Sequence, residues 1–359
     1  MTMIAMQESE KFPMLIGDLL FSSTFEKDFT YPSYNIKIDL PMDDGRHPYR
    51  MIQKTYIVHP CIAVVVAGNY QLILNFINAI KDYFKVHEAT VANLDSFIST
   101  YAVSPLKEAY GICIANPHNL EFQYRYLGCW TEKKYSAVGK IRSAGSGASD
   151  FLQLCDNFND EGFLLNVDTY RNAIANVCML FSTVLGEERY FANDVKHAWG
   201  AGFEITVFDY SKKHFVKIDN INYIIWKSKF DISKQKLETE PLSVMTYKYI
   251  GEALSITSHH GTNPNMYIIL PIYMDKSDFD QSQLPSIPFT DSDRICNIFQ
   301  VEIIDKDIIH PFCVFMEENV KSQTIFLKYD KNHFEVYLQQ GFNETLETIV
   351  KEWVANNKK

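Results

Sequence analysis

The stretch CIAVVVAGNYQLILNFINAIKDYF, residues 61–84, decides the fold. It begins with an unbroken apolar run, which is typical of a short strand buried on both faces. From Gln71 to Phe84 the apolar residues recur every three or four positions, the period of a helix that buries one side. Gly68 stands between the two patterns. The sequence therefore predicts a buried strand that leads directly into an amphipathic helix.

The residues that follow predict a second helix and then a hairpin. The helical period of apolar residues returns from Val91 to Tyr101. Tyr110–Ala115 and Leu120–Leu127 predict two strands, joined by NPHN at residues 116–119, a turn that proline and asparagine favour. We expect the two consecutive helices to cover one face of the sheet that these strands help to form.

Upstream of the opening stretch the pattern is that of strands. Thr2–Gln7 and Phe12–Ser22 predict two short strands around a turn. Residues 23–50 contain three prolines and the run MDDGR, which favours an extended polar excursion rather than core. Met51–Val58 predicts a further strand.

Residues 136–226 continue the alternation of strands and helices. The predicted elements are a short strand near Ser136–Val138, a strand, glycine turn and helix in KIRSAGSGASDFLQLC (residues 140–155), a helix over Thr169–Leu185 that ends at Gly186, a hairpin of Phe203–Phe208 and His214–Ile218, and a strand over Tyr223–Trp226.

The order of these elements predicts an α+β fold. For residues 1–228 the simplest arrangement is two antiparallel sheets packed together between two helix pairs, a four-layer αββα sandwich. A chain of 359 residues is long enough for two domains, and the texture changes at the charged stretch over residues 227–240. Residues 229–359 predict a smaller C-terminal α+β domain. Its expected elements are strands over residues 295–304, 312–317, 324–329 and 333–338 and a helix over residues 344–356.

Composition narrows the class of protein. The hydrophobic fraction of 47% and the aromatic fraction of 14% predict a folded, sheet-rich protein. A net charge of −10 argues against a nucleic-acid partner or an anionic membrane surface. The seven cysteines never occur as CxxC, which favours free thiols in a reducing compartment. No leader or membrane-spanning run is visible, so we expect a cytoplasmic protein.

Thr2 and Asp18 are the first candidate site residues. When a small residue follows Met1, that methionine is generally removed, which would leave Thr2 with a free amine beside its hydroxyl. An N-terminal threonine can then supply both the nucleophile and the base of an acyl transfer. Asp18 ends an apolar run sixteen positions later.

Further residues join these two. Lys54 lies in MIQKTYIV, just before the buried strand, and GSG at residues 145–147 lies between a strand and a helix. About the first 230 residues resemble a proteasome β-type subunit, and more closely the peptidase subunit of the bacterial proteasome-like proteases, which are N-terminal nucleophile (Ntn) hydrolases. The resemblance rests on Thr2, Gly17, Asp18, Lys54, Gly68 and Gly145-Ser146-Gly147.

The resemblance implies a threonine-nucleophile amide hydrolase of the Ntn sandwich type, most simply a peptidase, that works as a homo-oligomer without metal or cofactor. Lys54 would favour the neutral amine and the developing alkoxide, and Asp18 would keep Lys54 charged. The Gly68 N–H would stabilise the oxyanion, and Ser146 would orient the amine. A later aspartate of the family best matches Asp194, although His197, Gly200 and Gly202 depart from the family's pattern after it.

Several alternatives stay open. Lys37 competes with Lys54 for the role of the lysine, and the fold could be a non-catalytic member of the family that serves assembly or partner binding. A third possibility is a binding protein whose C-terminal sheet holds the ligand. His259-His260 lacks further residues at metal-ligand spacing, so a polar loop is expected there.

Overall fold

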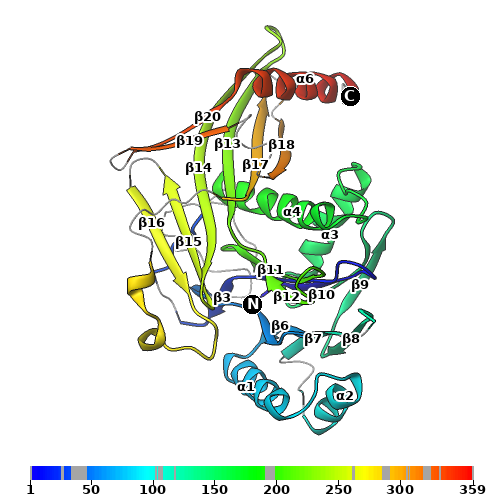
Figure 1. The fold of residues 1–359 in the computed structure, drawn as a ribbon. Coiled ribbons are helices and arrows are strands. Elements are labelled where there is room, and N and C mark those ends of the chain that lie inside the picture. Colours follow the sequence, from blue (N-terminus) through cyan, green and yellow to red (C-terminus); the bar gives the residue numbers. More distant parts are fainter. Residues whose placement is uncertain are drawn as a thin grey trace.

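The computed structural model describes residues 2–25, 28–33, 47–101, 103, 108–116, 119–190, 199–260, 263–284, 292–304, 306, 308–317, 325–330 and 333–357. Within these residues the chain is a mixed α+β protein with five α-helices and several antiparallel sheets (Figure 1). This confirms the coarse fold class predicted from the sequence.

A six-stranded antiparallel sheet carries the N-terminus. Its strand order is β12-β11-β2-β1-β10-β9. The strands are β1 (Ile4–Glu8), β2 (Met14–Asp18), β9 (Thr131–Tyr135), β10 (Gly139–Ala144), β11 (Phe203–Asp209) and β12 (His214–Lys217). Because β1 lies between β2 and β10, the start of the chain is held from both sides.

A four-stranded antiparallel sheet lies next to it, with its strands in sequence order. The strands are β5 (Thr55–His59), β6 (Ile62–Gly68), β7 (Glu108–Ala115) and β8 (Phe122–Leu127). The hairpin of β7 and β8 and the buried strand β6 lie where the sequence predicts them.

Apolar side chains of the two sheets share one core, and helices pack against each sheet. Val65 of β6 packs in the core between the sheets, whereas its neighbour Val64 packs against the first two helices. This is why the run that contains them is apolar at every position. The helices are α1 (Tyr70–Val86) and α2 (Val91–Thr100) on the four-stranded sheet, and α3 (Ala148–Asp160) and α4 (Tyr170–Tyr190) on the six-stranded one (Figure 1).

Two predicted strands are interrupted in the structure. The segment Phe12–Ser22 is divided at Leu19 into β2 and β3 (Leu20–Ser23), because the Leu19 N–H leaves the ladder and donates to the carbonyls of Gly200 and Gly202. Met51–Val58 is likewise divided: β4 (His47–Met51) pairs with β3, and β5 starts only at Thr55. Lys54 therefore lies in the irregular segment before β5, not within a strand.

The prediction of a short strand near Ser136–Val138 is wrong. These residues form the turn that joins β9 to β10, whose first ladder pair is Gly139 with Tyr135. Gly139 has a positive φ of 80°, which glycine adopts without strain and which lets the chain reverse there.

The C-terminal part contains a second six-stranded sheet, in the order β16-β15-β14-β13-β17-β18. It is mixed, because β13 pairs in parallel with β17. The elements are β13 (Ile221–Asp231), β14 (Lys236–Ile250), β15 (Ala253–His260), β16 (Asn263–Ile269), β17 (Arg294–Ile303) and β18 (Ile308–Glu317), short 3-10 turns at Lys276–Asp278 and Gln281–Gln283, the hairpin β19 (Ile325–Asp330) and β20 (His333–Leu338), and α6 (Gln340–Asn356).

This sheet is joined closely to the N-terminal part. The expected domain boundary at residue 228 lies inside β13. Side chains of α4, β13 and β17 share one apolar core with β1 and β2. The polar loop expected at His259-His260 is instead the end of β15, which pairs with β16, and His259 is buried. Of the helices described, none is long and apolar enough to cross a membrane.

Candidate active site

The hairpin of β1 and β2 brings Thr2 and Asp18 together. Ile4 pairs with Gly17, and the Asp18 N–H donates to the Met3 carbonyl at 3.0 Å. The Asp18 side chain is fully buried, and its Oδ1 accepts hydrogen bonds from Thr2 Oγ1 at 2.9 Å and from the Met3 N–H at 2.8 Å. The pairing expected from the sequence is therefore present as a direct contact with the threonine hydroxyl.

Lys54 reaches the same carboxylate from the segment just before β5. Its ammonium forms an ion pair with Asp18 Oδ1 and donates to the Leu20 carbonyl at 2.7 Å. The side chain is only 2% exposed. Burial lowers the pKa of Lys54, and the carboxylates of Asp18 and Glu204 oppose that shift. A buried ion pair of this kind keeps a positive charge beside the threonine without exposing it to water.

The GSG turn at residues 145–147 closes the other side of Thr2. The Thr2 nitrogen donates to Ser146 Oγ at 3.1 Å, and the Gly147 N–H donates to the Thr2 carbonyl at 3.2 Å. Gly145 has a φ of 94°, and a Cβ at this position would overlap the Thr2 carbonyl oxygen. Glycine is required there for both reasons. The turn then leads into α3.

Gly68 ends β6 and is exposed at the start of α1. Asn69 caps this helix, because its side chain accepts from the N–H groups of Gln71 and Leu72. The capped helix begins directly after Gly68 and Asn69, and Gly68 is the residue that the family resemblance implies for the oxyanion site.

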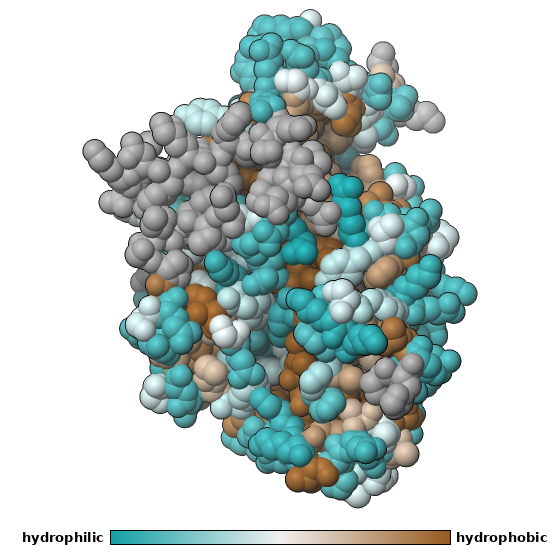
Figure 2. Space-filling model, in the orientation of Figure 1, coloured by the Kyte–Doolittle hydropathy of each residue, from teal (hydrophilic) through white to brown (hydrophobic). Residues whose placement is uncertain are grey.

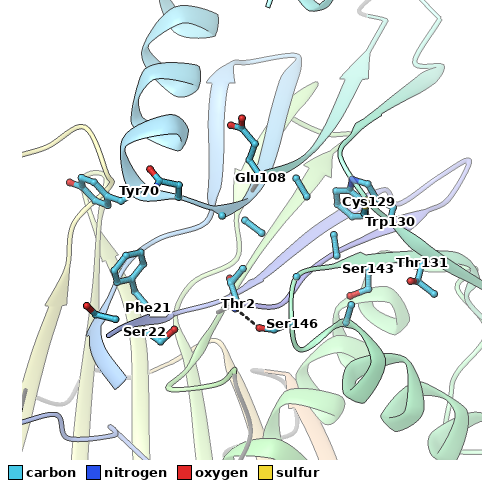
Figure 3. Close-up of a pocket in the computed structure, with 18 of the residues that line it drawn as sticks. Thr2, Phe21, Ser22, Tyr70, Glu108, Cys129, Trp130, Thr131, Ser143 and Ser146 are labelled. Carbon is cyan, nitrogen blue, oxygen red and sulfur yellow. Dashed lines mark hydrogen bonds between the residues drawn. The ribbon is translucent and has the colours of Figure 1, made fainter. Parts of the chain in front are cut away.

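A cavity of about 960 Å3 opens over Thr2. Phe21, Ser22 and Tyr70 lie on one side of Thr2, and Cys129 and Trp130 on the other (Figure 3). Gly68 and Ser146 also line it. On the face of the molecule that Figure 2 shows, a strip of hydrophobic surface runs through the centre, close to where Figure 1 marks the N-terminus. Thr2 lines this cavity although the residue is only 6% exposed.

The predicted residues thus fall into two groups. The structure brings together Thr2, Asp18, Lys54, Gly68 and Ser146 around one cavity or its floor. Asp194, His197 and the rival Lys37 lie outside the described residues.

Sequence reasoning missed groups that hold Asp18 and Lys54. The Gly200 N–H donates to Asp18 Oδ2 at 2.9 Å, so the carboxylate is satisfied at both oxygens. The buried Glu204 accepts from the N–H groups of Lys54 and Thr55. A glutamate in the middle of the apolar strand FEITVF was the available signal for the second contact. Main-chain donors such as the Gly200 N–H leave no signal in a single sequence.

Thr2 and Lys54 both contact the carboxylate of Asp18. Among the described hydrogen bonds, none joins Lys54 Nζ directly to Thr2 Oγ1, and the two atoms share Asp18 Oδ1 instead. The hydroxyl is therefore oriented by a carboxylate whose charge is balanced by the lysine. A free amine on Thr2 would place a base within reach of the hydroxyl of the same residue.

The sequence was compared with models of known protein families and with curated proteins, and neither comparison gives a match.

Proposed function

We propose that the chain is an Ntn hydrolase of the proteasome β type that cleaves amide bonds of peptides through Thr2, after removal of Met1. In this proposal residues 1–228 form the four-layer αββα sandwich of that class. The observation that carries it is the convergence on Thr2: its nitrogen contacts Ser146, its hydroxyl contacts Asp18, and Asp18 also holds Lys54. These contacts lie at the floor of a cavity large enough for a peptide segment.

Acylation begins at the threonine hydroxyl. The free α-amine, whose ordinary pKa is about 7.7 to 8.0, takes the hydroxyl proton as Oγ1 attacks the carbonyl carbon of the substrate. The Lys54 charge stabilises the developing negative charge on Oγ1, and Asp18 keeps that charge in place. The oxyanion of the tetrahedral intermediate is stabilised by the Gly68 N–H at the cavity wall.

Collapse of the intermediate breaks the carbon–nitrogen bond. The proton held by the α-amine passes to the leaving nitrogen, which departs as an amine, and the acyl group remains as an ester on Thr2. Water, deprotonated by the same α-amine, then attacks the ester carbon. The bond from that carbon to Oγ1 breaks, the amine returns the proton to Oγ1, and a carboxylic acid is released. Ser146 keeps the amine directed at the reacting atoms through both steps.

We extend the proposal to the compartment, the substrate and the oligomeric state of the protein. All seven cysteines are free thiols, which supports a reducing compartment such as the cytoplasm. The substrate is a peptide or another amide, and the working form is a homo-oligomer. Neither a cofactor nor a nucleic-acid or membrane partner enters the proposed reaction.

The N-terminus provides the test. Intact mass of the purified full chain should show the loss of Met1, and a β-lactone should add to Thr2, as located by peptide mapping. Thr2→Ser should still react and Thr2→Ala should not. In a second preparation a protease-cleaved fusion releases Thr2 as the first residue directly.

If Thr2 exposed in this second preparation does not react with the β-lactone, the hydrolase proposal is wrong. The same fold would then serve assembly or partner binding without catalysis. If only the fusion-released protein reacts, the site is competent and Met1 removal is the step that controls it.

A further inference from the structure

The backbone around Lys54 is not fixed by a regular strand. Residues 52–54 lie between β4 and β5, outside any ladder. The N–H groups of Lys54 and Thr55 instead donate to one carboxylate oxygen, Oε1 of Glu204, with a distance of 2.6 Å for Thr55. The Lys54 carbonyl accepts from the Val66 N–H of β6 at 2.9 Å, so β6 and the Glu204 carboxylate together hold the backbone of the lysine.

Glu204 is held by two donors from different parts of the chain. Its Oε2 accepts from Lys217 Nζ at 2.7 Å and from the Tyr249 hydroxyl at 3.0 Å. Lys217 belongs to β12, next to the strand of Glu204. Tyr249 belongs to β14, in the C-terminal sheet. Because the Glu204 side chain is fully buried, each donor contributes to keeping its charge in place.

Gln53 makes a second connection to the C-terminal part. Its buried side-chain amide donates to the carbonyls of Glu252 at 2.7 Å and Ile269 at 2.9 Å. Both hydrogen bonds come from the residue directly before Lys54. In addition, the hydroxyl of Tyr70, a residue of the cavity wall, donates to the Ile272 carbonyl at 3.3 Å.

We propose that Tyr249 and Gln53 are positioning residues for Lys54, and that the C-terminal part of the chain supports them through Tyr249 itself and through the carbonyls of Glu252 and Ile269. Tyr249 acts through Glu204, and Gln53 acts through the main chain. The inference rests on the proposed function and extends it, since it assigns a role to the C-terminal part. A displacement of about 1 Å at a catalytic group can reduce a rate by roughly a hundredfold, so small losses of positioning are measurable.

Tyr249→Phe in the full chain tests this, with Tyr273→Phe as the matched control. The Tyr273 hydroxyl donates to the exposed Glu252 side chain at 2.8 Å, so the control removes the same group from the same region. The measured quantities are the maximal rate of Thr2 acylation by a β-lactone and the concentration that gives half of it. We expect Tyr249→Phe to lower the maximal rate roughly tenfold at an unchanged half-saturating concentration. The control should behave as the unaltered protein.

Gln53→Met keeps the inference testable if Tyr249→Phe fails to fold, as judged by its thermal melt. It should lower the maximal rate in the same way. Unchanged rates in the folded variants, with labelling of the unaltered protein, refute the inference and leave the proposed function standing. An unaltered protein that does not react at all refutes the proposed function instead.

Discussion

Glu188 links the stability of this protein to pH. It lies on α4 and points into the core, where Oε2 accepts from Ser33 Oγ at 2.6 Å and Oε1 accepts from the Ala201 N–H at 2.9 Å. Burial raises the pKa of this carboxyl to about 7, from an ordinary value of 4.5, and the nearby charge of Asp18 adds to the rise. The folded chain therefore binds a proton on Glu188 at pH values where the unfolded chain has released it.

The sign of the effect follows from this difference. Because the folded-state pKa is the higher one, the contribution of Glu188 to stability is largest at low pH and is lost as the pH rises through about 7. Linkage between the two pKa values gives a loss of about 2.5 kcal/mol between roughly pH 5 and pH 8.5. In Glu188→Gln the amide stays neutral and can still accept from Ala201 and donate to the hydroxyl of Ser33, so this loss should disappear.

The measurement is urea unfolding of both proteins, followed by tryptophan fluorescence at a series of pH values. We expect Glu188→Gln to gain stability relative to the unaltered protein as the pH rises, by about 2.5 kcal/mol across that range. Glu344→Gln, on the outer part of α6, controls for the loss of a carboxylate elsewhere. A difference between Glu188→Gln and the unaltered protein that stays constant with pH would refute the reasoning.

Three further predictions concern the site. Lys54→Met should reduce the free energy of unfolding by about 3–5 kcal/mol, because Asp18 is left buried without its cation, and the double variant with Asp18→Asn should recover much of it in urea unfolding. Gly145→Ala should reduce the free energy of unfolding by at least roughly 1–2 kcal/mol and should abolish β-lactone labelling of Thr2, because residue 145 has a positive φ and a Cβ there would overlap the Thr2 carbonyl. Normal labelling would contradict this prediction. Cys129 is exposed and lines the cavity, whereas the other cysteines are buried or half-buried, so a maleimide should modify it first and slow labelling of Thr2; Cys129→Ser should remove that inhibition.

The parts of the fold that sequence predicts are those with a local cause. The helix α1 and the strand β6 follow from the period of their apolar residues, and both lie where expected. The breaks at Leu19 and before Thr55 have distant causes instead, since they depend on carbonyls of Gly200 and Gly202 and on the carboxylate of Glu204. The parallel pairing of β13 with β17 is likewise a long-range contact that no local sequence pattern predicts.

In the candidate site, too, the sequence predicts some groups and not others. Thr2, Asp18 and Ser146 could be proposed because their residue types and spacing suit one chemistry, and the structure brings them into contact. The Leu20 carbonyl and the Gly200 N–H could not, because any residue type can supply a main-chain group. Tyr249 was missed because a tyrosine in a strand normally serves packing.

The contacts of Thr2 can form only after much of the chain has been translated. Because translation runs from the N-terminus, Thr2 is made well before the Ser146 hydroxyl that contacts its nitrogen and the Gly200 N–H that donates to Asp18. At about 5–20 residues per second, the delay to Gly200 is on the order of ten seconds or more. Under the proposed function, Thr2 lacks the contacts that would activate it throughout that interval. The chain therefore cannot hydrolyse neighbouring proteins before it has folded.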